Sequence, residues 1–250
     1  MKRIEFIGAP YVGKSFLFEK VKAKRNELSR ELIFEHDILN SGYQIKLLRL
    51  LNKLLQSYFR KTINFYDVKL NSTILKGYSD VLYPFFQQNE TLNSSDVEDI
   101  FLFYKSYSTI LSRIKKYETI GNHFGNSKIL IAEESILHWQ LVLKKYFYSN
   151  FKDYANRDET LKAVIFCYGS EEVLKERFKL RSKVAQVNKN HQAKDMNEVI
   201  DDIIKTQDYF LDLTKNLSKT KPVLKINTAD DIEVNRIKVI KFLNDNSKTL

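Results

Sequence analysis

The residues best placed to do chemistry form an eight-residue stretch near the N-terminus that fits the pattern G-x-x-x-x-G-K-[ST] at every position. In such a stretch successive backbone N–H groups point inward and cradle phosphate oxygens, and the glycines let the backbone approach those oxygens closely. Lys14 is expected to contact the β- and γ-phosphates of a nucleotide, and the Ser15 hydroxyl to bind Mg²⁺. The predicted nucleotide-binding residues are Gly8, Ala9, Pro10, Tyr11, Val12, Gly13, Lys14, Ser15 and Phe16.

Two adjacent carboxylates, Glu133 and Glu134, directly follow the apolar run 128–132. A carboxylate at the end of a buried strand can complete a Mg²⁺ site or orient a nucleophile, since carboxylate and hydroxyl oxygens are the ligands that this ion prefers. The predicted metal ligands are therefore Ser15, Glu133 and Glu134. The alternative is an acidic pair that only begins a helix.

A second pair of acids, Glu35 and Asp37, follows the short apolar run 32–34. In an open parallel sheet, ligands bind outside the carboxyl ends of the strands, so both acids are expected at the same edge of the sheet as the phosphate-binding loop. A carboxylate there could accept the proton of an acceptor hydroxyl during phosphoryl transfer. The alternative is a loop acid without a catalytic role.

A basic helix is predicted after the apolar run 163–168, and it carries Arg177 and Arg181 four residues apart on one face. Cations that close over a triphosphate stabilise the charge of the transferring group and exclude water. We therefore include both arginines, with Lys14, Glu35 and Asp37, among the candidate catalytic residues. An ordinary solvated basic face is the alternative.

The elements that must position these residues alternate between strands and helices, which predicts an α/β fold with a mostly parallel sheet. Strands are expected at 2–7, 32–34, 128–132, 163–168 and 223–226. Apolar residues at helical spacing dominate the stretch between the second and third strands. We therefore predict one domain, 1–250, with a large helical insertion at 41–125.

Composition limits the possible partners and surroundings. The net charge of +10 is spread along the chain, so nucleic-acid binding is possible but not favoured. No signal-peptide pattern or run of about 18 apolar residues is present, and a cytoplasmic protein without a membrane span is expected. The single cysteine, Cys167, lies in an apolar run and is expected to be a buried, inert thiol. A homodimer is possible.

The loop at 8–15, the acid after the second strand, the acid after the third strand and the basic helix, in this order, resemble the nucleoside and nucleotide kinases of the P-loop proteins, which include thymidylate kinase. The resemblance covers about 1–37, 128–185 and 221–245 and implies a three-layer P-loop NTPase fold that uses ATP and Mg²⁺. It also implies that residues 175–181 form a lid whose Arg177 and Arg181 contact the transition state. It places Glu35 where deoxynucleoside kinases keep their base. The arginine that follows the third-strand acid in those enzymes is absent, because Ser135 follows Glu133 and Glu134.

These features predict an ATP-dependent phosphotransferase that moves the γ-phosphoryl group to a small hydroxyl or phosphate acceptor. The alternative is a nucleotide-dependent switch or NTPase whose basic helical insertion binds a macromolecule such as nucleic acid. The two differ in where the basic residues of the insertion point: into the crevice beside the phosphate loop, or over an outer face. Those residues are Arg49, Arg60, Lys61, Arg113, Lys115 and Lys116.

Overall fold

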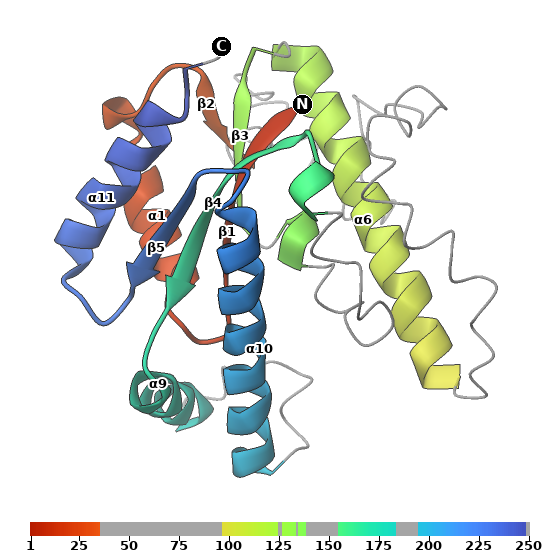
Figure 1. The fold of residues 1–250 in the computed structure, drawn as a ribbon, viewed down its shortest axis with the longest axis vertical. Helices are drawn as coiled ribbons and strands as arrows, with labels where there is room; N and C mark the ends of the chain where they lie inside the picture. Colours follow the sequence, from red (N-terminus) through yellow and green to blue (C-terminus); the bar gives the residue numbers. More distant parts are fainter. Residues whose placement is uncertain (36–96, 125–126, 134, 139–154, 184–194, 249–250) are drawn as a thin grey trace, which may run out of the picture.

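Five apolar segments pair as one parallel sheet in the computed structural model (Figure 1). The structure describes residues 1–35, 97–124, 127–133, 135–138, 155–183 and 195–248. The strands are β1 (Lys2–Gly8), β2 (Leu32–Phe34), β3 (Ile129–Glu133), β4 (Leu161–Tyr168) and β5 (Val223–Asn227). They lie in the order β2-β3-β1-β4-β5, and each neighbouring pair is parallel. The predicted α/β class is confirmed, and all five expected strands form.

Helices cover both faces of this sheet, which makes three layers. The described elements are α1 (Lys14–Lys22), the 3₁₀ turn η1 (Arg25–Glu27), α6 (Val97–Phe124), α9 (Glu171–Lys183), α10 (Met196–Leu217) and α11 (Ile232–Asp245). On one face, Phe18 of α1 and Val239 of α11 share a core with Ile4 of β1. On the other face, Phe210 of α10 packs with Ile7 of β1. Alternate residues of β1 serve opposite faces, so the strand is buried on both sides, and the charged residues Arg3 and Glu5 are buried with its apolar ones.

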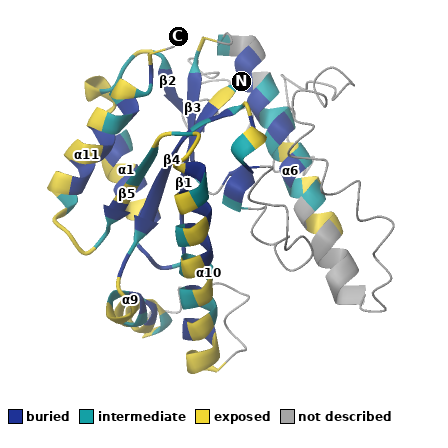
Figure 2. Cartoon of the chain, viewed as in Figure 1, coloured by how far each residue is buried: buried dark blue, intermediate teal, exposed yellow. Residues whose placement is uncertain are grey.

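Burial follows this layering closely (Figure 2). The strands β1, β3 and β4 are dark along almost their whole length, whereas α10 and α11 are buried on one side and exposed on the other. Cys167 lies inside β4, and burial raises the pKa of its thiol to about 12. Such a thiol is not a nucleophile near neutral pH, as the sequence predicts.

The long helix α6 fills the side of the molecule beside β3 (Figure 1). Ile110, Ile114 and Tyr117 are fully buried, at a spacing that places them on one helical face. The Tyr117 hydroxyl hydrogen-bonds that of Ser135, which follows β3 closely. Residues 97–124 of the predicted insertion are thus helical, while residues 41–96 lie outside the described part of the chain, and the domain organisation stays a prediction.

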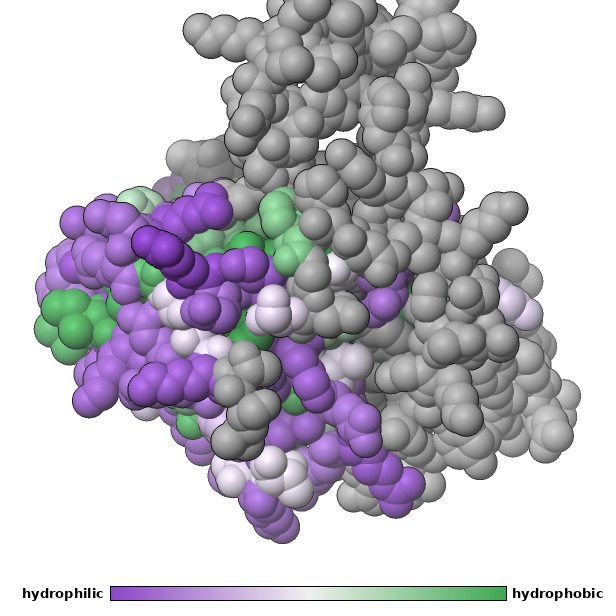
Figure 3. Space-filling model, turned by 90° about the horizontal axis from the view of Figure 1, so that it is seen from above, coloured by the Kyte–Doolittle hydropathy of each residue, from purple (hydrophilic) through white to green (hydrophobic). Residues whose placement is uncertain are grey.

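The described residues seen from above form a mainly hydrophilic face (Figure 3). Seen from above, the end that carries both termini shows charged and polar residues with only small apolar areas between them (Figure 3). Within the described residues, no helix is long and apolar enough to cross a membrane.

An ionic cluster is buried where β1 and β4 begin, at the end of the sheet opposite the phosphate loop. The Arg3 guanidinium is fully buried and donates to the carboxylates of Glu5 and Asp158, at 2.5 Å in each case. Burial alone would raise the pKa of Asp158, but the charge and hydrogen bonds of Arg3 outweigh it and lower that pKa. The cluster therefore depends on Arg3, because its one guanidinium compensates both buried carboxylates.

Replacing Asp158 with asparagine is expected to destabilise the fold by about 3–5 kcal/mol, because it leaves the buried Arg3 charge incompletely paired. Urea unfolding followed by circular dichroism measures this change. Glu19→Gln, which removes an exposed carboxylate near Lys22, is the matched control and should barely move the unfolding midpoint. If the two substitutions lowered the stability equally, the buried Arg3 cluster would stabilise the fold no more than an exposed ion pair does.

Candidate nucleotide-binding site

The phosphate loop joins the end of β1 to the start of α1, and its two glycines are needed for different reasons. A Cβ atom on Gly8 would lie 2.5 Å from the backbone oxygen of Cys167, so only glycine lets β1 and β4 approach this closely. Gly13 has a φ of +95°, in the left-handed region that side chains disfavour, and it directly precedes α1. Tyr11 also has a positive φ, of +65°. The loop is therefore tightly curved and close to its neighbours.

Lys14 and Ser15 begin α1 and lie at the carboxyl end of the central strand. Lys14 is buried, at 4% exposure, while Ser15 is exposed. The Ser15 hydroxyl donates a hydrogen bond to Oε1 of Glu133, which ends β3. This contact depends on the strand order, because β3 lies directly beside β1 and pairs Glu133 with Phe6. Two of the three predicted metal ligands are thus in contact, and Glu134 lies outside the described residues.

The Ser15–Glu133 pair suits Mg²⁺ in both chemistry and number of ligands. Both side chains offer hard oxygen atoms, and this ion usually takes only one or two protein ligands, with water and phosphate oxygens supplying the rest. Among the described residues, no group of three or more His, Cys, Asp or Glu side chains forms a metal site without a nucleotide. The pair would hold the ion, and the ion when bound would neutralise phosphate charge.

Glu35 directly follows β2 and is buried, at 2% exposure. Arg113 and Lys116 of α6 both donate to its Oε1, the lysine at 2.7 Å. Asp37, the other predicted base, lies outside the described part of the chain.

A polar groove of about 510 Å³ lies along α6 next to this ion pair. Three hydroxyl groups and the two cations that hold Glu35 line it: Ser108, Thr109, Ser112, Arg113 and Lys116. Hydroxyls and cations together are suited to a small ligand that carries both hydroxyl and anionic groups. The sequence did not single out the three hydroxyl residues, because α6 can be aligned with Glu35 only in three dimensions.

The two predicted arginines of α9 reach the phosphate loop. Arg177 donates to the backbone oxygen of Val12 and, at 2.7 and 2.8 Å, to the hydroxyl and backbone oxygens of Thr228. Burial lowers the pKa of Arg177. The Arg181 guanidinium lies over the ring of Tyr11, 5.5 Å from its centroid. Both cations are therefore beside the loop, and their contact with a transferring phosphoryl group stays a prediction.

Thr228, on the loop after β5, was missed by sequence reasoning. The signal that could have found it is the rule that located Glu35 and Glu133: polar residues just beyond a strand's carboxyl end belong to the binding edge of a parallel sheet. Asp231 shapes this loop from the other side, because its carboxylate accepts from the backbone N–H groups of Glu233 and Val234 and caps α11.

A cavity of about 550 Å³ opens between the phosphate loop, α9 and the β5–α11 loop. Its wall combines apolar side chains with the two arginines of α9. The lining residues are Tyr11, Gly13, Phe16, Leu17, Arg177, Leu180, Arg181, Thr228, Ala229, Asp230, Ile232 and Asn235. Its size falls in the range of small-molecule sites, and its apolar wall suits a flat aromatic group.

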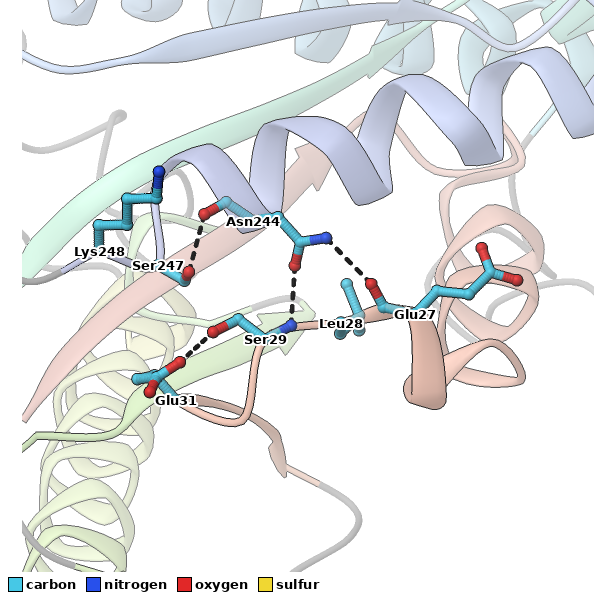
Figure 4. A pocket seen from close by; sticks show the side chains of 7 residues that line it. All are labelled: Glu27, Leu28, Ser29, Glu31, Asn244, Ser247 and Lys248. Atoms are coloured by element: carbon cyan, nitrogen blue, oxygen red, sulfur yellow. Dashed lines mark hydrogen bonds between the residues drawn. The ribbon is translucent and has the colours of Figure 1, made fainter.

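A larger hollow, of about 620 Å³, lies elsewhere (Figure 4). It is formed by the segment before β2 and the end of α11. Its polar groups largely bond one another: Asn244 accepts from the backbone of Ser29 at 2.8 Å and donates to the backbone oxygen of Glu27 at 3.0 Å. Since this hollow is at the amino end of β2 and the phosphate loop follows the carboxyl end of β1, its size does not make it the reaction site.

No model of a known protein family matches the chain, and no curated protein matches it in sequence. Among solved structures, it is similar to a shikimate kinase from Bacteroides thetaiotaomicron, with 16% identity, 97% of this chain and 98% of that chain covered, and a TM-score of 0.40. It is also similar to a deoxyadenosine kinase from M. mycoides solved with bound dATP, with 15% identity, 97% and 99% coverage, and a TM-score of 0.45. Likeness at this level says nothing about the reaction. The narrower resemblance to the thymidylate kinase group stays a prediction.

Proposed function

We propose that this protein is a phosphotransferase that moves the γ-phosphoryl group of ATP to a small hydroxyl or phosphate acceptor. The observation that carries the proposal is the contact between the Ser15 hydroxyl and the Glu133 carboxylate, directly beside Lys14 at the start of α1. A cradle of backbone N–H groups, a lysine and a metal-binding oxygen pair are the parts that phosphoryl transfer from a nucleotide requires.

The nucleotide would bind across the carboxyl end of the sheet. Its phosphates would occupy the loop at 8–15, with Lys14 toward the β- and γ-phosphates, and its base would enter the cavity beside Phe16 and Arg181. Mg²⁺, held by Ser15 and Glu133, would offset the charge of the phosphates. Such a reaction needs a supply of ATP, which fits a cytoplasmic location.

The acceptor would lie on the β2 side of the phosphate loop, where α6 closes the edge of the sheet. Glu35 is the proposed base: Arg113 and Lys116 hold its Oε1, and its Oε2 would accept the acceptor's proton. Asp37 remains an alternative base. The proposed insertion, 41–125, would thus build the acceptor site through α6.

The direction of these cations favours a small acceptor over a macromolecular partner. Arg113 and Lys116 turn toward Glu35 at the edge of the sheet rather than over an outer face. Arg49, Arg60 and Lys61 lie outside the described residues. The switch or NTPase alternative would need a basic surface facing outward.

Substituting Glu133 with glutamine tests the metal-binding pair. The amide keeps the shape but loses the charge, so we expect the Mg²⁺ concentration for half-maximal ATP turnover to rise about tenfold, in line with a lost charge-assisted contact. The measurement is transfer of radiolabelled γ-phosphate to a panel of hydroxyl and phosphate metabolites at varied Mg²⁺. Glu198→Gln, an exposed acid of α10, is the control and should match wild type. A wild-type protein that neither binds nor consumes ATP would overturn the proposed function.

A further inference from the structure

One peptide of the phosphate loop, between Val12 and Gly13, is held from outside the loop. The Val12 carbonyl oxygen accepts from the Thr228 hydroxyl at 2.5 Å and from the Arg177 guanidinium. The Thr228 hydroxyl also lies 3.2 Å from the Tyr168 backbone oxygen. A hydroxyl has a single proton to donate, and the shorter distance favours Val12.

Thr228 is itself firmly placed. Its backbone N–H donates to the Tyr168 oxygen at 2.9 Å, which continues the pairing of β5 with β4. Its backbone oxygen accepts from Arg177 at 2.8 Å, and its hydroxyl accepts from the same guanidinium at 2.7 Å. The residue therefore links the end of β5, the helix α9 and the phosphate loop.

The orientation of this peptide decides what the loop offers to a phosphate. In a trans peptide the C=O and N–H bonds point in opposite directions, so a Val12 carbonyl that faces Thr228 turns the Gly13 N–H to the other side. Among the described residues, no backbone acceptor takes that N–H. A free N–H directly before Lys14 is what a phosphate oxygen would bind.

Gly13 makes this orientation easy to lose. Glycine reaches φ values of either sign at little cost, so its own conformation does not prevent the preceding peptide from rotating. The rotated peptide would direct a carbonyl oxygen, with its partial negative charge, at the phosphates. The contacts to Thr228 and Arg177 oppose that rotation.

We propose that Thr228 is a positioning residue of the phosphate site: its hydroxyl, together with Arg177, keeps the Gly13 N–H directed at the nucleotide phosphates. This rests on the proposed function, because it assumes that the loop at 8–15 binds phosphates. It gives Arg177 a role in the ground state, through the loop backbone, in addition to any contact with the transferring group.

The test compares Thr228→Val, which keeps the side-chain shape without the hydroxyl, with Thr228→Ser, which keeps the hydroxyl. Binding of ATP, inorganic tripolyphosphate and adenosine is measured by calorimetry. We expect Thr228→Val to weaken the binding of ATP and of tripolyphosphate about five- to tenfold, which corresponds to the loss of one hydrogen bond. The affinity for adenosine should not change. Thr228→Ser should restore wild-type affinity. Thr206→Val is the matched control, because it removes a hydroxyl that donates to a backbone oxygen within α10.

A second comparison addresses the partnership with Arg177. Both donors act on the same carbonyl, so their effects should not be independent. The double variant Arg177→Leu with Thr228→Val should therefore lose tripolyphosphate affinity by a factor that differs from the product of the two single-variant losses. If Thr228→Val does not fold, Thr228→Ala serves in its place with the same expectations.

Three results would overturn the proposal. Tripolyphosphate affinity unchanged in Thr228→Val would do so, as would an equal loss in Thr228→Ser, which would indicate packing rather than the hydroxyl. An equal loss for adenosine would place the effect in the base cavity. Failure of the wild-type protein to bind either ATP or tripolyphosphate would overturn the proposed function as well, whereas binding that is insensitive to Thr228 would overturn only this inference.

Discussion

Replacing Lys14 with alanine is expected to weaken ATP binding about a hundredfold or more and to abolish turnover, with the fold retained. Lys14 begins α1 beside the Ser15–Glu133 pair, and several charge-assisted hydrogen bonds to phosphate would be lost together. Calorimetric titration with ATP and Mg²⁺ measures the affinity.

The burial of Lys14 makes the choice of control important. At 4% exposure, its aliphatic stem contributes to packing, so alanine could lower stability as well as affinity. Lys14→Met keeps most of that stem and removes only the charge. We expect methionine to bind ATP as poorly as alanine while unfolding at nearly the wild-type temperature. If the methionine variant bound ATP with wild-type affinity, the assignment of the loop at 8–15 as the phosphate-binding loop would be wrong.

Replacing Glu35 with glutamine should lower turnover on a hydroxyl acceptor about a hundredfold or more, with ATP affinity nearly unchanged. A positioned base contributes on this scale, and an amide cannot accept the acceptor's proton in its place. Glu35 and the phosphate loop follow different strands, so the nucleotide should not sense the substitution directly. The measurement is steady-state transfer with saturating ATP and varied acceptor.

The same substitution distinguishes the two acceptor classes. Transfer to an existing phosphate needs no base and depends instead on cations, so for a phosphate acceptor Glu35→Gln should change the maximal rate little. Arg113→Gln would then raise the acceptor's KM by roughly tenfold, through loss of a charge-assisted contact. A large rate loss in Glu35→Gln with an unchanged KM in Arg113→Gln establishes the hydroxyl acceptor, and the opposite pattern excludes Glu35 as the base.

Local patterns in the sequence predict much of the fold. A strand buried on both faces is mostly apolar, although β1 also buries Arg3 and Glu5. The expected strands that end at Ile7, Ala132 and Tyr168 all pair in the sheet within a residue or two of their expected limits. The phosphate loop is equally local, because its curvature comes from the φ of Gly13 and the closeness permitted by Gly8. Lys14 and Ser15 then follow from the start of α1.

The partners of the candidate site are not local. Glu133 reaches Ser15 only because β3, far along the chain, inserts beside β1 rather than at an edge. Arg113 and Lys116 lie 78 and 81 residues from the Glu35 that they hold. From sequence these cations indicated a basic insertion, and only the packing of α6 turned them toward the carboxyl end of β2.

Thr228 shows most clearly which part of the site the tertiary structure decides. Its place after β5 indicates the binding edge of the sheet but not its partner, and it lies 216 residues from the Val12 carbonyl that it contacts. The glycines of the phosphate loop permit its curvature wherever the loop is placed, whereas the contacts to its Val12 carbonyl come from the distant Thr228 and Arg177. Which side chains complete and orient that loop was decided by the order of the strands, because parallel pairing puts all carboxyl ends at one edge and the order determines which of them are neighbours.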